Sequence, residues 1–419
     1  MVLQHTSGTR LPAAFATCVL ACLSPYAGAA AGEPATPAWK LSGFGTLGAV
    51  YADSRDADFT ASVLRADGAG HTQAWSPDVD SRLGAQLDLR LGAWSGVLQV
   101  VSEQRLDGSY RPQLEWANIK YQLTPDLALR AGRIALPVFL GAESRKVGYT
   151  IPWVRPPVEV YGALPVSSSD GLDATWRWST GPVLHATQVF AGRTDQNLHN
   201  GLRIQAKHIV GLSHSIERGA LSARLSAAGA RLDTAIGEDL FAILRGFGPQ
   251  GNRLADRYEI RDKRVSMFSA GMSYDPGPWF VTAECGRTRT DSLLGGGTSA
   301  YVGAGLRRGA LTPYAGYAQV RADFPTHDPG LALEGLPPPL AAAASQVNAG
   351  LNGYLATIPV QSTWSAGLRW DAATNIALKL QFDRVQPREG TRGALINNQP
   401  GFRPDHAVHV GSVAMDFVF

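Results

Sequence analysis

The chain has 419 residues, a formal net charge of +3, 17% charged residues and 46 glycines. A hydrophobic content of 45% with 36 aromatic residues excludes an intrinsically disordered chain, and the modest hydropathy excludes a bundle of membrane helices. A length of this order usually predicts two or three domains, although closed all-β folds run longer as one unit.

Residues 1–31 have the pattern of a secretory signal peptide that is cleaved. Arg10 precedes an apolar stretch from Leu11 to Leu23, and the small residues 27–31 supply a cleavage site. The apolar stretch is too short for a membrane anchor, which needs about 20 residues. The mature chain is therefore predicted to be residues 32–419.

Two of the three cysteines, Cys18 and Cys22, lie inside this predicted signal. The sequence before Cys22 is faintly similar to a lipoprotein acylation site, which stays open as the lesser alternative. Removal of the signal leaves Cys285 alone, so we expect neither a disulfide framework nor a cysteine-based metal site.

The next feature along the chain is strict alternation of apolar and polar residues, which gives a strand one apolar and one polar face. In the segment 82–91, for example, leucines and alanine alternate with charged residues, glycine and glutamine. Each such segment is close to the 9 to 11 residues that a tilted strand needs to cross a bilayer. We count about 16 of them, at 41–52, 82–91, 94–103, 114–123, 127–136, 171–179, 183–191, 203–216, 220–229, 265–274, 278–287, 298–308, 311–321, 361–370, 376–385 and 407–419.

The connections between these segments alternate in length. Short turns rich in Gly, Pro and Asp, such as 92–93 and 124–126, alternate with long loops, such as 137–170, 230–264 and 322–360. Outer-membrane barrels have short periplasmic turns and long extracellular loops. The sequence therefore predicts an all-β fold, a transmembrane antiparallel β-barrel of about 16 strands, located in the bacterial outer membrane.

Aromatic residues gather near the short turns, on the apolar face of the predicted strands. Amphipathic rings favour the boundary between lipid and water, so this group is expected to form a girdle. Its members are Trp94, Tyr121, Trp178, Tyr274, Trp279, Trp370, Phe417 and Phe419.

The last strand carries a more specific resemblance. Met415-Asp416-Phe417-Val418-Phe419 is similar to the aromatic-terminated final strand of Gram-negative general porins, and the whole mature chain resembles that family in pattern. The resemblance implies 16 strands, a homotrimer and a loop, here 137–170, folded into the lumen as a constriction. It also implies that Phe417 and Phe419 form a signal read by the barrel-assembly machinery.

No convincing catalytic or cofactor-binding motif is present. Residues Gly43 to Gly48 match G-x-G-x-x-G formally, but they lie inside a predicted strand with no helix after it, so strand curvature or close approach explains the glycines better. The histidines are scattered rather than at metal-ligand spacing. We therefore expect no enzyme activity, cofactor, metal or nucleic acid, and instead a porin that lets small hydrophilic solutes diffuse; the alternative is a barrel enzyme or adhesin acting through its long loops.

The charges on the predicted inward faces favour anions. Twelve basic residues stand against six acidic residues, and this excess predicts a mild anion preference. The basic set is Arg82, Arg90, Lys120, Arg130, Arg177, Arg203, Lys207, Arg224, Arg307, Arg321, Arg369 and Lys379; the acidic set is Asp88, Glu103, Asp173, Glu284, Asp383 and Asp416. We select Arg82, Arg90, Lys120 and Arg130 as the pore wall, with Arg133 for its closeness to the loop, and Glu143, Glu159 and Asp170 as constriction-loop acids that face this wall.

Overall fold

A computed structural model describes residues 36–164, 166–197 and 202–419. The chain divides into residues 1–34 and a unit of residues 35–419, and the fold is that of the second unit. The predicted signal peptide lies outside the described residues. Across the described ranges, none of the helices combines the length and the hydrophobicity that crossing a bilayer requires.

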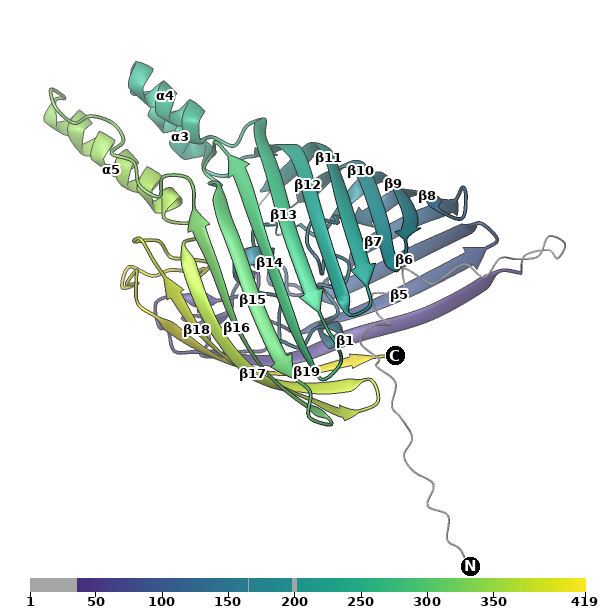
Figure 1. Ribbon diagram of the computed structural model, residues 1–419. Coiled ribbons are helices and arrows are strands. Elements are labelled where there is room, and N and C mark those ends of the chain that lie inside the picture. The colour runs from purple at the N-terminus through teal and green to yellow at the C-terminus, as the bar shows by residue number, and fades with distance from the viewer. Residues whose placement is uncertain (1–35, 165, 198–201) are drawn as a thin grey trace, which may run out of the picture. The chain divides into compact units, whose positions relative to one another are not determined.

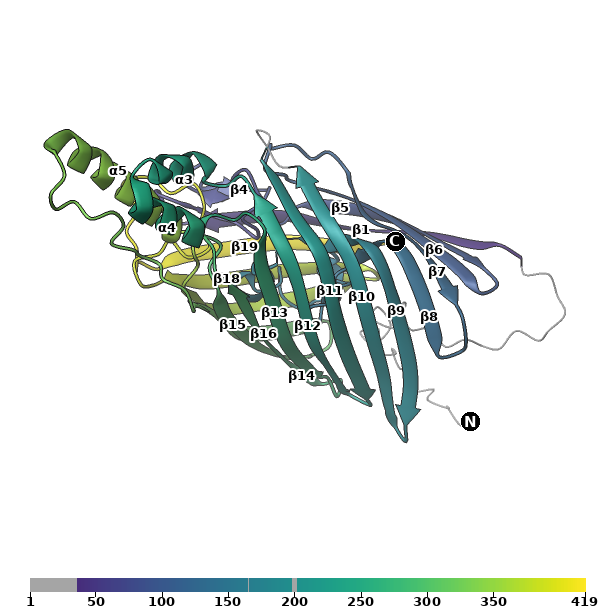
Figure 2. The same cartoon turned by 90° about the horizontal axis from the view of Figure 1, so that it is seen from above.

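The described residues form one antiparallel sheet of 17 strands, of which β4 (Trp75–Ser76) has two residues, leaving 16 long strands. Each strand pairs with its neighbour in the chain, and β1 pairs with both β5 and β19, which closes the barrel (Figure 1; Figure 2). The long strands are β1 (Ala38–Ala52), β5 (Arg82–Leu91), β6 (Trp94–Glu103), β7 (Gln113–Gln122), β8 (Leu127–Ala135), β9 (Ser168–Thr180), β10 (Val183–Asn197), β11 (Arg203–Arg218), β12 (Leu221–Thr234), β13 (Lys263–Tyr274), β14 (Trp279–Thr290), β15 (Gly297–Leu306), β16 (Leu311–Ala322), β17 (Gln361–Ala373), β18 (Ile376–Pro387) and β19 (Val408–Val418).

The predicted fold class is confirmed, strand by strand. The segments 82–91 and 94–103 match β5 and β6 to the residue, whereas β10 and β12 continue six and five residues beyond the predicted ends at 191 and 229. These extensions lie at the long-loop ends. Strand pairing continues there after the apolar alternation has ended, so hydrophobicity alone could not locate the boundary.

The apolar face of each strand points outward. On β5, Leu83 and Leu89 are about half exposed, whereas Gly84 between them is buried. The same holds for the aromatic girdle: Trp94, Trp279 and Trp370 are all exposed beside the short turns. An exposed apolar belt around a polar interior inverts the arrangement of a water-soluble barrel, and it fits a lipid surrounding.

Glycines on β1 make room for the aromatic end of the chain. A Cβ atom on Gly43 or Gly45 would overlap the ring of Phe419 or Phe417 respectively. These two rings stack on each other, with centroids 6.5 Å apart, along the seam between β1 and β19. Close approach is therefore the reason for the glycine pattern at residues 43–48.

Three of the twelve basic residues predicted to face inward, Arg203, Lys207 and Arg321, face outward instead. In β11 the register with β12 shifts between Lys207 and Val210, and His208 has a φ of 51°. This bulge exchanges the two faces, so Arg203 and Lys207 point away from the lumen. In β16, Ala318 and Val320 are buried and Arg321 is exposed, because apolar residues occupy both alternating sets and the alternation misleads.

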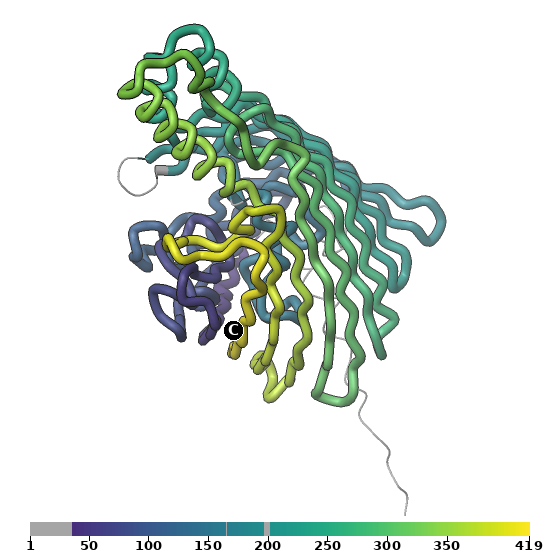
Figure 3. The backbone as a smooth tube through the Cα atoms, turned by 90° about the vertical axis from the view of Figure 1, so that its left-hand side faces the viewer, coloured from purple at the N-terminus to yellow at the C-terminus, as the bar shows by residue number. Residues whose placement is uncertain are grey.

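Among the described residues, helices of eight or more residues occupy two of the long loops. The α3 (Glu238–Arg245) and α4 (Gly248–Tyr258) helices follow β12, and α5 (Pro338–Leu355) follows β16. Phe241, Leu244, Tyr258, Leu351 and Leu355 bury their side chains in one shared cluster. The alanine run at 341–344, interpreted from sequence as plain loop, is therefore part of a packed helix (Figure 3).

Candidate functional site

The described part of the long connection between β8 and β9, residues 136–164 and 166–167, lies inside the barrel against one side of the wall. It contains the single turn η1 (Gly148–Thr150) and the short helix α2 (Val158–Tyr161). On β12, the Ser226 hydroxyl donates to the Pro137 carbonyl at 2.9 Å. On β14, Glu284 accepts from the Leu140 amide and the Tyr161 hydroxyl, each at 2.6 Å. These bonds attach the first and last parts of the loop to the wall.

Lys379 on β18 attaches the middle of the loop. Its ammonium group donates to the carbonyls of Gly148 and Ile151 at 2.8 Å and of Trp153 at 3.0 Å. It also pairs with Asp416 of β19 at 2.6 Å, and both side chains are fully buried. A buried ammonium group is tolerable only with its three protons bonded and its charge paired.

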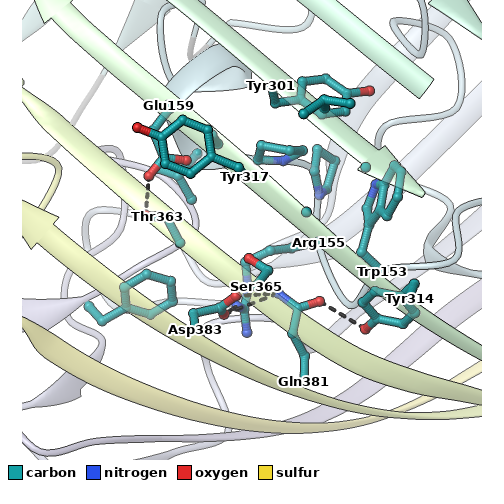
Figure 4. Close-up of a pocket in the computed structure, with 18 residues that line it drawn as sticks. Trp153, Arg155, Glu159, Tyr301, Tyr314, Tyr317, Thr363, Ser365, Gln381 and Asp383 are labelled. Carbon is teal, nitrogen blue, oxygen red and sulfur yellow. Dashed lines mark hydrogen bonds and ion pairs between the residues drawn. The ribbon is translucent and has the colours of Figure 1, made fainter. Parts of the chain in front are cut away.

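Arg155 makes the most extensive attachment. Its guanidinium donates to both carboxylate oxygens of Asp80, at 2.9 and 2.6 Å, to Asp383 at 3.1 Å and to the Ser412 hydroxyl at 2.6 Å. Figure 4 shows Arg155 beside Asp383, which also accepts from the Gln381 amide at 2.8 Å. A planar donor suits this paired geometry. One loop residue thus joins β18, β19 and the segment that precedes β5.

Glu159 on α2 is buried against β17. It accepts from the Gln361 amide at 2.6 Å, and Figure 4 shows that it also accepts from the Thr363 hydroxyl. Burial raises the pKa of Glu159, and these hydrogen bonds oppose the rise. This carboxyl group therefore faces the wall of β17 and not the arginines that we expected it to oppose.

Space for solutes lies on the other side of the loop. A pocket of about 50 Å³ lies between the loop and the wall of β15 to β18. A cavity of about 460 Å³ separates the loop from β5 to β8 and from the segment between β1 and β5. Its charged lining has seven basic side chains, Arg65, Arg82, Arg105, Arg133, Arg145, Lys146 and Arg155, and four acidic side chains, Glu103, Asp107, Glu115 and Asp195.

The charges in this cavity are only partly compensated. Glu103 pairs with Arg65 at 2.9 Å and with Lys146. Arg82 donates to the Asp80 carbonyl at 3.2 Å, and Arg145 to the Leu164 carbonyl at 3.1 Å. Burial lowers the pKa of Arg145. Among the described residues, neither Arg82 nor Arg145 has a carboxylate within ion-pairing distance, so these two charges of the cavity lining are not neutralised by an ion pair.

Of the five predicted wall cations, only Arg82 and Arg133 line this cavity. Arg90 is exposed beside the short turn after β5, and Lys120 lies opposite Arg130 in the sheet. Arg130 pairs with Asp173 at 2.7 Å. Because Arg130 is paired, this part of the barrel wall carries less net positive charge than the count of inward-facing residues predicted.

The predicted loop acids also differ from expectation. Glu143 pairs with Arg224 of β12 at 3.0 Å, on the side where the loop is attached. Asp170 belongs to β9 and not to the loop, and it pairs with Arg133 across the β8–β9 register at 2.7 Å. Neither carboxylate lies across the cavity from Arg82, and of the selected cations Asp170 contacts Arg133 alone.

Five cavity cations were missed by sequence reasoning: Arg65, Arg105, Arg145, Lys146 and Arg155. All lie in loops, where no alternation assigns a residue to a face. The three basic residues between 145 and 155 were the only sequence signal, and they indicate Arg145, Lys146 and Arg155 alone.

A closed barrel of 16 antiparallel strands with an apolar exterior and a charged lumen defines the class of transmembrane β-barrels. No protein-family model and no curated protein matches the sequence.

Solved structures do match, over nearly the whole chain. The chain is similar to Salmonella typhi OmpF in complex with daunomycin, with a TM-score of 0.56 and 13% identity over 91% of this chain and 97% of that one. It is also similar to the anion-selective porin from Comamonas acidovorans, with a TM-score of 0.55 and 12% identity over 92% and 100%. The outer-membrane channel DcaP of Acinetobacter baumannii gives a TM-score of 0.55 and 12% identity over 93% and 100%. The chain has the fold of 16-stranded outer-membrane porins.

Proposed function

We propose that this protein is a diffusion channel of the bacterial outer membrane that passes small hydrophilic solutes and mildly prefers anions. The loop 136–167 narrows the lumen, and solutes pass between it and β5 to β8. The observation that carries the proposal is the cavity of about 460 Å³, whose lining includes Arg82 and Arg145, two cations with no carboxylate within ion-pairing distance among the described residues. Fixed positive charge in a narrow, low-dielectric lumen lowers the barrier for anions.

The basis of the preference differs from the sequence prediction. Several wall cations are neutralised in pairs: Arg130 with Asp173, Arg224 with Glu143, and Lys379 with Asp416. The excess therefore resides mainly in loop cations together with Arg82. Anion selectivity is known for the similar porin of Comamonas acidovorans, but at 12% identity that likeness supports the fold only.

Reversal potentials in a salt gradient test the proposal. The variant R82S/R145S removes two cavity cations that have no carboxylate within ion-pairing distance among the described residues, and we expect its anion preference to fall or reverse. The matched control R218S/R308S removes two exposed cations beside the short turns, and its reversal potential should equal that of the unchanged protein. A cation preference in the unchanged protein, or equal shifts in both variants, contradicts the proposed selectivity. A barrel that does not conduct at all favours a role for the long loops as an enzyme or adhesin surface.

Three further features of the mature protein are proposed. Residues 1–31 are removed as a signal peptide, which N-terminal sequencing of the exported protein tests. The chain assembles as a homotrimer, for which the porin resemblance is the support; cross-linking in mild detergent that yields only monomers would contradict it. Phe417 and Phe419 are recognised by the barrel-assembly machinery.

A further inference from the structure

Two histidines that are 29 residues apart in the chain lie together on the outside of the barrel. His185 is on β10 and His214 on β11, and the register places His214 opposite Thr187, two residues along β10 from His185. Nδ1 of His185 and Nε2 of His214 are 3.5 Å apart. Only the pairing of β10 with β11 brings these rings together, so the spacing of the histidines in the sequence gave no indication of a metal site.

The alternation of exposure places both histidines on the outward face. His185 occupies the same set of alternating positions on β10 as Val189, which is 56% exposed, whereas Phe190 of the other set is buried. His214 occupies the same set of positions on β11 as Leu212, which is 48% exposed. Neither histidine lines the lumen cavity, so solute passage gives no reason for the pair.

The pair lies at the edge of the apolar belt on the short-turn side. His185 is opposite Trp178 of the aromatic girdle in the β9–β10 register, and the turn at residues 181–182 joins these two strands. The Trp178 and His185 rings stack, with centroids 5.0 Å apart and planes 5° from parallel. The indole therefore holds the His185 ring in one orientation, at a level where water and hydrated ions reach the imidazole nitrogens.

The distance between the two facing nitrogens fits a metal ion better than it fits a hydrogen bond. Good hydrogen bonds have donor–acceptor distances of about 2.7–3.2 Å, and the gap of 3.5 Å is longer. Two nitrogens bound to one tetrahedral ion at about 2.0–2.1 Å lie about 3.3–3.4 Å apart. A small rotation of the two rings therefore directs both lone pairs at one ion. Neutral imidazole suits zinc, copper and nickel among the divalent ions.

Thr187 orients His214 for this role. Its hydroxyl oxygen lies 2.9 Å from Nδ1 of His214. When Nδ1 carries the proton and donates it to Thr187, Nε2 keeps its lone pair toward His185. An oxygen acceptor on the second nitrogen is the usual partner of a metal-binding histidine, because it sets the tautomer and the orientation of the ring. The Thr187 contact is thus the one that a metal ligand needs, and Thr187 is a positioning residue.

We propose that His185 and His214 together bind one divalent transition-metal ion, such as zinc, at the short-turn edge of the barrel. Nδ1 of His185 and Nε2 of His214 are the protein ligands, and water molecules supply the remaining ligands. A proton on Nδ1 of His185 moves to Nε2 of the same ring, so both imidazoles bind the ion in their neutral form. The bound ion joins β10 to β11 and stabilises the folded barrel. This inference does not rest on the proposed channel function.

Isothermal titration calorimetry with zinc chloride tests the proposal on the detergent-solubilised protein after treatment with a chelator. The unchanged protein should bind zinc at this site, and the variant H185F/H214F, which keeps aromatic rings beside Trp178, should lose that binding. The matched control H71N/H208N removes two exposed histidines of other segments. Asparagine tolerates the φ of 51° at residue 208, so this control should fold and bind zinc like the unchanged protein. Equal zinc binding by the two variants would overturn the proposal.

Further measurements decide the question even if the double variant does not fold. X-ray absorption of zinc bound to the unchanged protein should show two imidazole rings with Zn–N distances of about 2.0 Å, and a spectrum without imidazole ligands contradicts the site. T187V keeps both imidazoles and the shape of the side chain, and it should weaken zinc binding at least about tenfold. An unaltered affinity in T187V contradicts the positioning role of Thr187. Single-channel conductance of H185F/H214F should equal that of the unchanged protein, which keeps this test separate from the channel test.

Discussion

At the scale of single residues, two buried cations hold the loop against the barrel wall; one belongs to the loop and the other to the wall. Arg155 extends from the loop into the wall, and Lys379 extends from the wall into the loop. Because each is fully bonded, removal of either leaves buried acceptors or charges without partners. Such a loss costs far more than the pair itself contributes.

We expect R155M to release the middle of the loop. Asp80 and Asp383 would remain buried without their shared partner, a cost of about 3–5 kcal/mol. Single-channel recordings should show larger conductance and more frequent fluctuations than the unchanged protein. R384S, which alters an exposed arginine on the next outward position of β18, serves as the control. A conductance identical in R155M and R384S would show that other contacts suffice to hold the loop.

Glu159 gives a pH-dependent prediction. Its pKa is raised in the folded protein, so the folded state binds the proton more tightly than the unfolded state does. Its contribution is favourable below the unfolded pKa and is lost as pH rises through the folded pKa. The variant E159Q cannot ionise. The melting temperature of E159Q minus that of the unchanged protein should therefore be more positive at pH 7 than at pH 4. A difference in melting temperature that is the same at both pH values would contradict this account.

At the scale of elements, the strands were predictable and the features between them were not. The alternation of apolar and polar residues located β5 and β6 to the residue. It did so because all residues on one face of such a strand have the same environment, either lipid or lumen. The bulge after Lys207 and the mixed alternation of β16 defeated the same rule. Helix α5 was missed because its alanine run has little polar contrast, and its buried partners lie more than 80 residues away in α3 and α4.

The cavity shows the same limit. Arg82 was placed correctly because it is on a strand, where its neighbours determine its face. The roles of Glu143 and Glu159 depended on which wall the loop contacts, through partners such as Arg224 and Thr363. Contacts between residues so far apart in the chain leave no periodic signal in a single sequence.

The seam between β1 and β19 supplies an element-scale prediction. G45A places a methyl group where the Phe417 ring lies, and we expect a loss of about 1–3 kcal/mol of stability from this overpacking. G411A lies on the same seam, opposite Tyr51, where an added methyl group meets open space, and it should change stability by less than about 0.5 kcal/mol. Urea denaturation in detergent measures both, and equal midpoints would contradict the role of the glycine.

At the scale of the whole molecule, the final aromatic residue allows assembly and stability to be separated. Phe419 is 67% exposed and packs mainly on Gly43. If it acts as a recognition signal, F419S should lower the amount of barrel assembled in cells while protein refolded from urea into detergent remains nearly as stable. Heat-modifiable migration on gels measures both fractions. Parallel losses in cells and in detergent would indicate a purely structural role.

The position of β1 determines when this molecule can become a barrel. Residues 38–46 of β1 pair with β5, and residues 44–52 pair with β19, so Gly43 contacts a residue 376 positions later. Until the last strand has been synthesised, two strand edges remain open, and an open edge is an aggregation hazard in water and is not tolerated in lipid. The chain must therefore be kept unfolded throughout its synthesis and export. Premature termination anywhere before residue 408 should yield a polypeptide for degradation and not a smaller pore.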